Sequence, residues 1–92
     1  MRITAELSLY PLTENYLATI ESLIRDLEGA EDLEIVVNQM STQLRGELGA
    51  IMTALEAALG RSFADGRPEV LVAKFLNADL PIGEPPDRAG AR

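Results

Sequence analysis

The fold is decided by the stretch Leu33-Glu34-Ile35-Val36-Val37-Asn38-Gln39-Met40-Ser41-Thr42-Gln43-Leu44-Arg45-Gly46-Glu47. Alternating apolar residues at Leu33, Ile35 and Val37 predict a half-buried strand. A further strand is predicted from Ser41 to Glu47, and Leu44, its one large apolar residue, is expected to face the core. The connection carries an amide, a thioether and hydroxyl groups, where a plain hairpin would carry glycine or Asn-Gly. These side chains indicate a place where polar groups gather around something small.

A strand and a helix precede this hairpin. Residues 3 to 9 alternate between apolar and polar side chains, which predicts a half-buried strand that Pro11 ends. Thr13 is a candidate cap for the helix that follows, and Gly29 is its predicted stop. The apolar stripe of this helix has helical spacing and consists of Tyr16, Leu17, Ile20, Leu23, Ile24 and Leu27.

A second helix and a last strand follow the hairpin. The helix is predicted from about Leu48 to Phe63, and Asp65-Gly66 ends it. The strand is predicted over the apolar run from Val70 to Leu76. The chain therefore alternates as strand, helix, strand, strand, helix, strand, which is the split βαβ arrangement.

This order predicts an α+β, ferredoxin-like βαββαβ sandwich. Right-handed crossovers place the first and third strands in the centre of a four-stranded antiparallel sheet of order 4-1-3-2, with both helices on one face. The predicted domain covers residues 1–80, and residues 81–92, rich in proline, glycine and charge, are expected to form a flexible tail. The other face of the sheet is left uncovered by the helices.

The composition excludes several classes of function. The formal charge of −7 and the pI of about 4.4 disfavour nucleic acid and favour a cationic ligand. The chain has no cysteine and no histidine, which removes thiolate chemistry, the commonest general base and the commonest transition-metal ligand. No apolar run has the length that crossing a bilayer requires, and the N-terminus lacks the apolar stretch of a signal peptide, so a cytoplasmic location is expected.

The uncovered face carries the candidate site. Thr4, Glu6, Ser8 and Tyr10 are predicted along its middle, and the residues expected to flank them are Gln43, Arg45, Val70, Val72 and Lys74, with Asn38, Met40 and Ser41 at the rim. Such a mixture of apolar and hydrogen-bonding groups suits a small-molecule pocket or a subunit interface.

Each candidate residue also has a purely structural interpretation. Glu6 can bind a cation or an amino group, or form an ordinary cross-strand ion pair with Arg45 or Lys74. Tyr10 can stack on a flat ring or simply pack at the end of the sheet. Met40 can contact a ligand or a partner chain, and the hydroxyls of residues 41 and 42 can bind a ligand or only form the turn.

The residues resemble a known family, the thiamine-binding, YkoF-like family of small ferredoxin-like domains. The resemblance rests on Ile3-Thr4-Ala5-Glu6-Leu7-Ser8-Leu9-Tyr10-Pro11-Leu12, on Asn38-Gln39-Met40-Ser41-Thr42-Gln43 followed by Gly46-Glu47, and on Lys74-Phe75-Leu76-Asn77. It implies binding of thiamine or its hydroxymethylpyrimidine part in vitamin uptake or salvage, and assembly through the sheet as a homodimer or homotetramer. The ligand-binding residues that it implies are Glu6, Ser8, Tyr10, Asn38, Met40, Ser41 and Thr42.

Two other classes of function are weighed against this hypothesis. One is a structural or regulatory homo-oligomer whose open sheet face only joins subunits, without a ligand. The other is an enzyme, which is disfavoured because no nucleophile-base pair is visible and no histidine can activate a serine or threonine. No loop has the spacing of a calcium site, so neither a metal nor a cofactor is expected.

Overall fold

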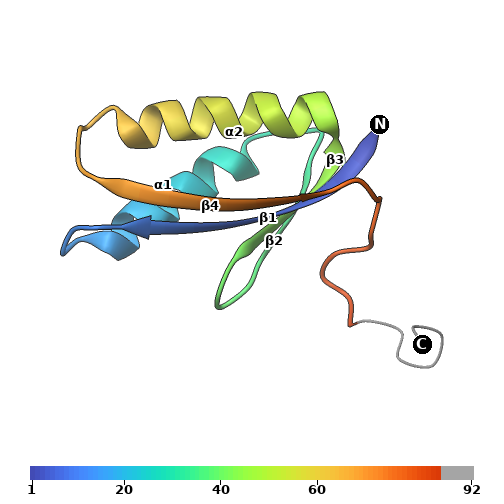
Figure 1. Ribbon diagram of the computed structural model, residues 1–92, viewed down its shortest axis with the longest axis horizontal. Coiled ribbons are helices and arrows are strands. Elements are labelled where there is room, and N and C mark those ends of the chain that lie inside the picture. The colour runs from blue at the N-terminus through green and yellow to red at the C-terminus, as the bar shows by residue number, and fades with distance from the viewer. Residues whose placement is uncertain (86–92) are drawn as a thin grey trace.

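The computed structural model describes residues 1–85, and its six elements follow the predicted order (Figure 1). In chain order they are β1 (Arg2–Pro11), α1 (Tyr16–Glu28), β2 (Glu34–Val37), β3 (Thr42–Glu47), α2 (Leu48–Phe63) and β4 (Glu69–Leu76). The strands form one antiparallel sheet of order β2-β3-β1-β4, which is the predicted order. Both helices lie on the same side of this sheet (Figure 1).

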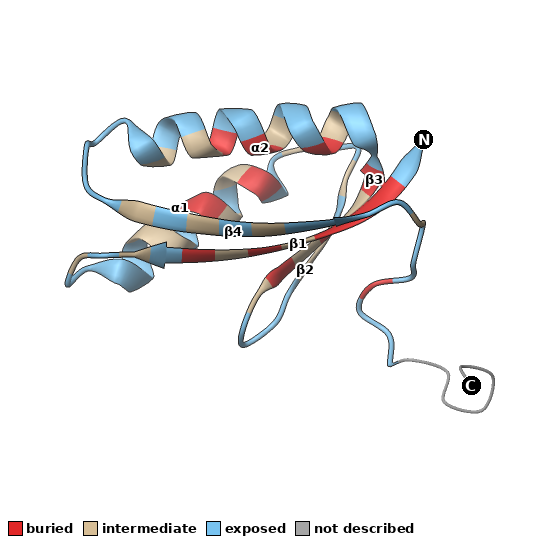
Figure 2. Cartoon of the chain, viewed as in Figure 1, coloured by how far each residue is buried: buried red, intermediate tan, exposed pale blue. Residues whose placement is uncertain are grey.

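The core lies between the sheet and the two helices. The odd-numbered residues Ile3, Ala5, Leu7 and Leu9 of β1 are buried on the helix side, as their alternation predicts. The largest fully buried side chains come from α1, β3 and α2, and they are Leu27, Leu44 and Ile51. Figure 2 shows the buried segments of the helices turned toward the sheet. Leu44 therefore faces the core, which confirms the predicted orientation of its strand.

The start of α1 differs from the prediction. The helix begins at Tyr16 after Asn15, which occupies the capping position without a side-chain hydrogen bond. Thr13 lies before the helix, and its hydroxyl oxygen is buried without a hydrogen-bond partner, so its predicted role as the cap is wrong. The end of the helix is confirmed, because Gly29 follows the last helical residue and its N–H donates to the carbonyl of Arg25, while the N–H of Ala30 donates to that of Leu27.

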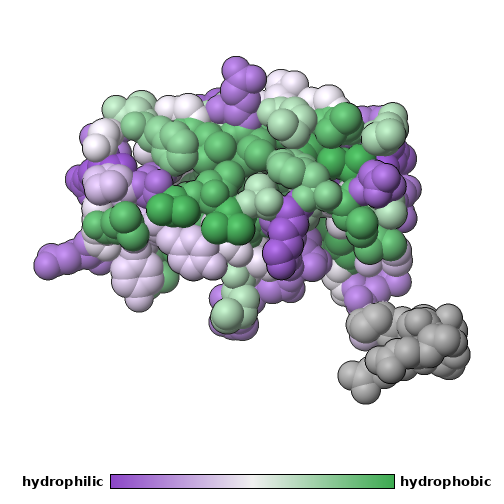
Figure 3. All heavy atoms as spheres, in the orientation of Figure 1, coloured by the Kyte–Doolittle hydropathy of each residue, from purple (hydrophilic) through white to green (hydrophobic). Residues whose placement is uncertain are grey.

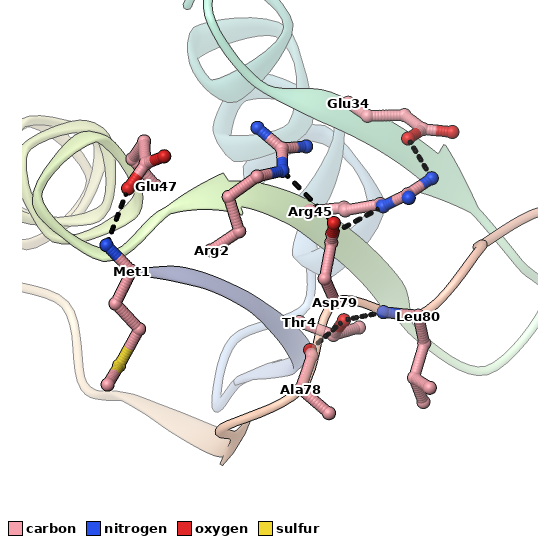
Figure 4. A network of polar contacts seen from close by, with 9 residues as sticks. All are labelled: Met1, Arg2, Thr4, Glu34, Arg45, Glu47, Ala78, Asp79 and Leu80. Atoms are coloured by element: carbon pink, nitrogen blue, oxygen red, sulfur yellow. Dashed lines mark hydrogen bonds and ion pairs between the residues drawn. The ribbon is translucent and has the colours of Figure 1, made fainter.

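A segment after β4, residues 77–83, crosses the face of the sheet that the helices leave open; we call it the C-terminal strap. The hydroxyl of Thr4 donates to the carbonyl of Ala78 at 2.8 Å and accepts from the N–H of Leu80 at 3.0 Å. The carboxylate of Asp79 joins Arg2 of β1, at 3.2 Å, to Arg45 of β3, at 2.7 Å (Figure 4). These contacts fix the strap over the two central strands.

The strap continues as far as β2. Ile82 is only 8% exposed, and Gly83 lies against Val36, whose Cγ2 would be 3.1 Å from a Cβ at the glycine. Figure 1 shows this part of the chain below the sheet, on the side away from the helices. The beginning of the segment predicted to be a flexible tail is therefore packed on the sheet, while residues 86–92 of that prediction lie outside the described residues.

We expect Asp79→Asn to loosen the strap, because it removes the negative charge that holds two arginines. The ion pair with Arg45 lowers the pKa of Asp79 below its usual 3.8, so the contact should persist until the pH falls through that lowered value. Amide hydrogen exchange of Leu80 should accelerate in the variant at neutral pH. Glu84→Gln, a change at an exposed carboxylate just beyond the strap, is the control. Equal exchange at Leu80 in Asp79→Asn and in the wild type would contradict this role of Asp79.

Gly46 of β3 permits a close approach of the loop that precedes β2. A Cβ at this position would lie 2.8 Å from Leu33 Cδ2 and 3.2 Å from the carbonyl oxygen of Asp32. Gly46→Ala should therefore lower the free energy of unfolding by about 1–3 kcal/mol, the usual cost of overpacking. Denaturant titration measures the change.

The matched control is Gly60→Ala in α2, where a Cβ would meet nothing within 4 Å. Alanine has the higher helix propensity, so this variant should be unchanged or stabilised by up to about 1 kcal/mol. A Gly46→Ala protein as stable as the Gly60→Ala protein would show that the strand and the loop are not tightly apposed.

Candidate functional site

The register of the strands sets which side chains meet on the open face. Glu6 lies between Gln43 of β3 and Lys74 of β4, whereas Arg45 lies opposite Thr4. The prediction that Arg45 lies beside Glu6 is therefore wrong, because the pairing of β1 with β3 places Gln43, two residues earlier in β3, in that position. Arg45 instead pairs with Glu34, at 3.3 Å, and with Asp79. The predicted neighbour Lys74 is confirmed.

The carboxylate of Glu6 gathers three donors from the two neighbouring strands and the hairpin. Its Oε2 accepts from Ser41 Oγ at 3.0 Å and from Gln43 Nε2 at 3.5 Å, and its Oε1 lies 3.5 Å from Lys74 Nζ. The hydrogen bond from Ser41, followed by that from Gln43, lowers the pKa of Glu6 below its ordinary value of 4.5. Glu6 is therefore a fixed anion at neutral pH, and it has both the structural ion pair and the accessible carboxylate that the sequence left as alternatives.

A cavity opens beside this carboxylate because β1 is longer than β3. The two strands pair only as far as Leu7 and Thr42, whereas β1 continues to Pro11 against β4 alone. The space beyond the last pair is enclosed by α1 and by the hairpin, and it has a volume of about 170 Å³. Its lining consists of Leu7, Ser8, Leu9, Tyr10, Ile20, Leu23, Ile24, Val37, Asn38, Gln39, Met40, Ser41 and Thr42.

The hairpin forms one wall of the cavity. Its bend is closed by a 2.7 Å hydrogen bond from the N–H of Asn38 to the carbonyl of Ser41. Neither Gln39 nor Met40 has a positive φ, so the bend is not one of the primed turns that match strand twist, and other two-residue turns splay the strands apart. The hydroxyl of Ser8 donates to the carbonyl of Met40 at 3.4 Å and ties β1 to the bend.

Six of the seven predicted site residues line this cavity. Tyr10 and Met40 stand at its exposed side, 54% and 87% exposed, while Thr42 points to the helix side with Leu44 and is only 8% exposed. Glu6 does not line the cavity, but it is connected to it through Ser41, which lines the cavity and donates to the carboxylate. The structure thus brings the predicted residues together at one end of the sheet, on both sides of β1.

Sequence reasoning missed the apolar wall of the cavity and the amide that faces Glu6. Ile20, Leu23 and Ile24 belong to the apolar stripe of α1, which was interpreted as core alone. Their place in the sequence, one to two helical turns after Tyr16, could have indicated this role, because that part of α1 lies beside the end of β1. Gln43 was placed on the correct face, but only the register identifies it as a partner of Glu6.

A larger open groove of about 730 Å³ lies elsewhere, between the end of α1 and most of the length of α2. Small side chains such as Ala50, Ala54 and Ala57 form its floor, and charged residues, including Asp26 and Arg61, form its rim. It contains none of the predicted site residues. The smaller cavity is the better candidate because it combines apolar walls with convergent polar groups, which is typical of small-molecule sites.

Two further observations concern residues 1–85. Neither helix combines the length and the apolar character that crossing a membrane requires. In the same residues, acidic side chains are nowhere grouped in threes in a way that could hold a metal ion.

Similar folds occur in solved structures from bacteria and archaea. A protein of Streptococcus pneumoniae is 24% identical, with a TM-score of 0.78, over 87% of this chain and 90% of that one. A hypothetical protein of Methanocaldococcus jannaschii is also 24% identical, with a TM-score of 0.74, over 85% and 81%. A protein of Thermotoga maritima with a candidate role in thiamine biosynthesis or salvage is 16% identical, with a TM-score of 0.78, over 89% and 91%. No curated protein matches the chain.

The fold and the site define a small ferredoxin-like α+β domain with a cavity of apolar walls and a few polar groups, at the point where β1 extends beyond β3. The sequence pattern of the YKOF-related family matches residues 2–81, nearly the whole of this domain. The chain belongs to the YKOF-related family.

The hydrogen bond from Ser41 gives a direct test of the electrostatics. Ser41→Ala removes the main cause of the lowered pKa, so the pKa of Glu6 should rise toward 4.5. A carbon-detected NMR titration of the Glu6 carboxyl group measures it. A pKa of Glu6 that is lower in the folded than in the unfolded state stabilises the folded state at any pH above the unfolded-state pKa. This stabilisation is lost as the pH falls through the folded-state pKa. Below pH 4.5, the free energy of unfolding should therefore fall more for the wild type than for Ser41→Ala.

Ser62→Ala is the matched control, because Ser62 donates to Glu69 and not to Glu6. It should leave the pKa of Glu6 unchanged. If Ser41→Ala leaves it unchanged as well, the serine does not hold the carboxylate in solution.

Proposed function

We propose that this protein binds thiamine, or its hydroxymethylpyrimidine part, at the cavity beside Glu6 without catalysing a reaction. The observation that carries the proposal is the link through Ser41, which joins an ionised carboxylate to a cavity with apolar walls. A small-molecule site needs this combination of apolar enclosure and a few placed polar groups. The proposed ligand-binding residues are those expected from the sequence, with Gln43 added as a partner of Glu6.

The size of the cavity favours one ring over a whole two-ring ligand. Its volume of about 170 Å³ lies below the roughly 300–1,000 Å³ of drug-sized sites. An aminopyrimidine ring presents an amino group and ring nitrogens, which suit the carboxylate of Glu6, the hydroxyl of Ser41 and the amide of Asn38. The apolar side chains from α1 then cover the faces of the ring.

The charge of the protein favours the second part of thiamine. The thiazolium ring is a permanent cation, and the chain has a formal charge of −7. The exposed face of Tyr10 lies at the mouth of the cavity, where a cation can stack on an aromatic ring. Within residues 1–85, Lys74 is the one cation paired with Glu6, and a cationic ligand would compete with it for the carboxylate.

A structurally similar protein also supports a role that involves thiamine. The Thermotoga maritima structure, which shares the fold, comes from a protein with a candidate role in thiamine biosynthesis or salvage. At 16% identity this likeness carries the fold alone, so the ligand of this chain is our proposal. We propose a role in vitamin uptake or salvage in the cytoplasm, for a homo-oligomer assembled through the sheet.

A role without chemistry agrees with the side chains at the cavity. Its polar groups are hydroxyls, amides and backbone groups, and Glu6 is held by its donors as an anion with a lowered pKa. A general acid or base would need a pKa close to the working pH. These side chains favour binding of a ligand over its chemical transformation.

Isothermal titration of the purified protein with thiamine, and separately with hydroxymethylpyrimidine, tests the proposal. We expect saturable heat with both ligands and a higher melting temperature, because a ligand that binds only the folded state stabilises it. The double variant Glu6→Gln with Ser41→Ala should remain folded and weaken binding by about tenfold or more, since hydrogen bonds to a charged group contribute ~1.5–3 kcal/mol each.

Glu28→Gln, at the far end of α1, removes a carboxylate from the outer surface and is the control for net charge. It should bind as the wild type does. Folded protein that gives no heat and no shift of melting temperature at millimolar ligand would rule out the proposal and favour an assembly protein without a ligand. Unchanged affinity in the double variant would place the ligand elsewhere on the molecule.

A further inference from the structure

We propose that Arg2 and Arg45 form a binding site for a phosphate dianion, either the free ion or the phosphoryl group of a small ester, and that the C-terminal strap occupies this site when the anion is absent. Asp79 of the strap then acts as a tethered competitor, and binding of phosphate releases the strap from the sheet. This inference concerns the end of the sheet away from the cavity and does not rest on the proposed thiamine site.

Two arginines from the central strands converge on one carboxylate (Figure 4). Arg2 Nε of β1 lies 3.2 Å from Asp79 Oδ2, and Arg45 Nε of β3 lies 2.7 Å from Asp79 Oδ1. The register brings them together, because Arg45 pairs with Thr4, which follows Arg2 by two residues and faces the same side of the sheet. Guanidinium groups arranged around one set of oxygen atoms are typical of sites that hold carboxylates and phosphates.

The sheet alone leaves these two arginines with too little negative charge. Arg45 is paired with Glu34 of β2 at 3.3 Å. Glu47 lies opposite Arg2, but it is paired with the N-terminal ammonium of Met1 at 2.8 Å. The side chain of Arg45 is only 26% exposed, and a partly desolvated cation without enough counter-charge is unfavourable. This part of the sheet therefore requires a further anion.

Asp79 supplies that anion but uses only part of the hydrogen-bonding capacity of the arginines. Each of its oxygens meets a single N–H, the Nε of one guanidinium group. Among residues 1–85, Arg2 has no other acceptor, so its terminal N–H groups have no partner there. A phosphate has more acceptor oxygens than a carboxylate, carries close to two negative charges at neutral pH and can bind arginine in a bidentate way. Phosphate therefore suits the pair better than the carboxylate that occupies it.

The contact between Asp79 and the arginines is an ion pair that dissolved anions can reach. The hydrogen bond between them raises the pKa of Arg45 and lowers the pKa of Asp79, each relative to its ordinary value, so both groups are charged at neutral pH. The side chain of Asp79 is 38% exposed. Ions in solution screen and replace exposed charge pairs, so a phosphate can compete for this one.

The rest of the C-terminal strap is held by few contacts. The hydroxyl of Thr4 bonds to the backbone of Ala78 and Leu80, Ile82 is the one buried side chain of residues 77–83, and Gly83 lies against Val36. No residue of this segment belongs to a strand of the sheet. Segments with little buried apolar surface and few backbone hydrogen bonds open at a low cost in free energy. Loss of the ion pairs of Asp79 should therefore be enough to release the strap.

Phosphate binding and docking of the strap exclude each other, because both use the same N–H groups. By linkage, an anion that displaces Asp79 loosens the strap, and the docked strap lowers the apparent affinity for the anion. Release uncovers the open face around Thr4, which lies roughly 7 Å along β1 from Glu6. The network thus makes access to this part of the sheet depend on the concentration of phosphate.

A purely structural clamp, in which nothing displaces Asp79, is the alternative. It predicts the same loosening of the strap in Asp79→Asn but no binding of an anion. The formal charge of −7 disfavours anions in general. On the side of the molecule in Figure 3, apolar side chains predominate over α2 and β4, so this side has no extended polar surface for an anion. Phosphate that binds should therefore depend on the two arginines.

Isothermal titration with inorganic phosphate, and separately with phenyl phosphate, tests the proposal in a buffer without other multivalent anions. Wild-type protein should bind phosphate in the millimolar range. Asp79→Asn should bind about tenfold or more tightly, because the tethered competitor is gone. Asp79→Asn with Arg45→Gln should bind neither compound. Heat with inorganic phosphate identifies the free ion as a ligand, whereas heat with phenyl phosphate alone identifies an ester.

Asp79→Asn with Arg67→Gln is the matched control, because Arg67 is exposed in the loop before β4, at the far end of the sheet, and the net charge is the same. It should bind phosphate as Asp79→Asn does. Asp79→Asn with Arg2→Gln, at the more exposed arginine of the pair, should lose binding and guards against a folding defect caused by the change at Arg45. In the wild type, phosphate should accelerate amide exchange of Leu80, and sodium chloride of equal ionic strength should not.

Three results would overturn the proposal. They are the absence of saturable heat with both compounds in folded Asp79→Asn protein, equal affinity in the wild type and in Asp79→Asn, and equal binding by the Arg45 and Arg67 double variants. Circular dichroism shows whether each variant is folded. Because the thiamine titrations use other variants and another ligand, either proposal can fail without the other.

Discussion

The structure depends on the two-sided character of β1. Its odd-numbered side chains are buried between the sheet and the helices, and its even-numbered side chains face the other way, where they hold the strap and the carboxylate of Glu6. The period of a strand makes these two roles inseparable, because a shift of one residue would exchange them completely. The hydrophobic packing of Ile3, Ala5 and Leu7 thus sets the position of Glu6 as firmly as any contact on the open face.

Unequal strand lengths convert this regular sheet into a site. Pairing of β1 with β3 stops at Leu7, and the four residues that follow are supported by β4 on one side only. The hairpin bend and the first turns of α1 enclose the remaining space without filling it. The same sheet is asymmetric at its other end, where the strap occupies the open face. The cavity and the strap therefore occupy opposite ends of one small domain.

The sequence was sufficient for the architecture because alternation and helical spacing are local signals. The buried orientation of Leu44 and the order of the strands were both predicted correctly. The neighbour of Glu6 on β4, Lys74, was also predicted correctly, but its neighbour on β3 was not. That neighbour depends on the register of β1 against β3, and a shift of two residues in the pairing puts Gln43 in the place expected for Arg45. The strap was also missed. A segment with proline, glycine and charge has no periodicity, and its one apolar anchor, Ile82, is visible only against the sheet. The prediction that Thr13 caps α1 was wrong because several polar residues precede the helix, and the sequence alone does not show which of them occupies the capping position.

The pairing of the domain's first and last strands has a consequence for its biogenesis. β1, the first strand of the domain, pairs along most of its length with β4, the last of its four strands, and Thr4 bonds to residues 78 and 80. Contacts between residues so distant in sequence are slow to form because they close the largest loops. The sheet cannot be completed on the ribosome until β4 has emerged. A nascent chain that stalls before β4 therefore presents its central strand with one edge unpaired, and such an edge is a template for aggregation.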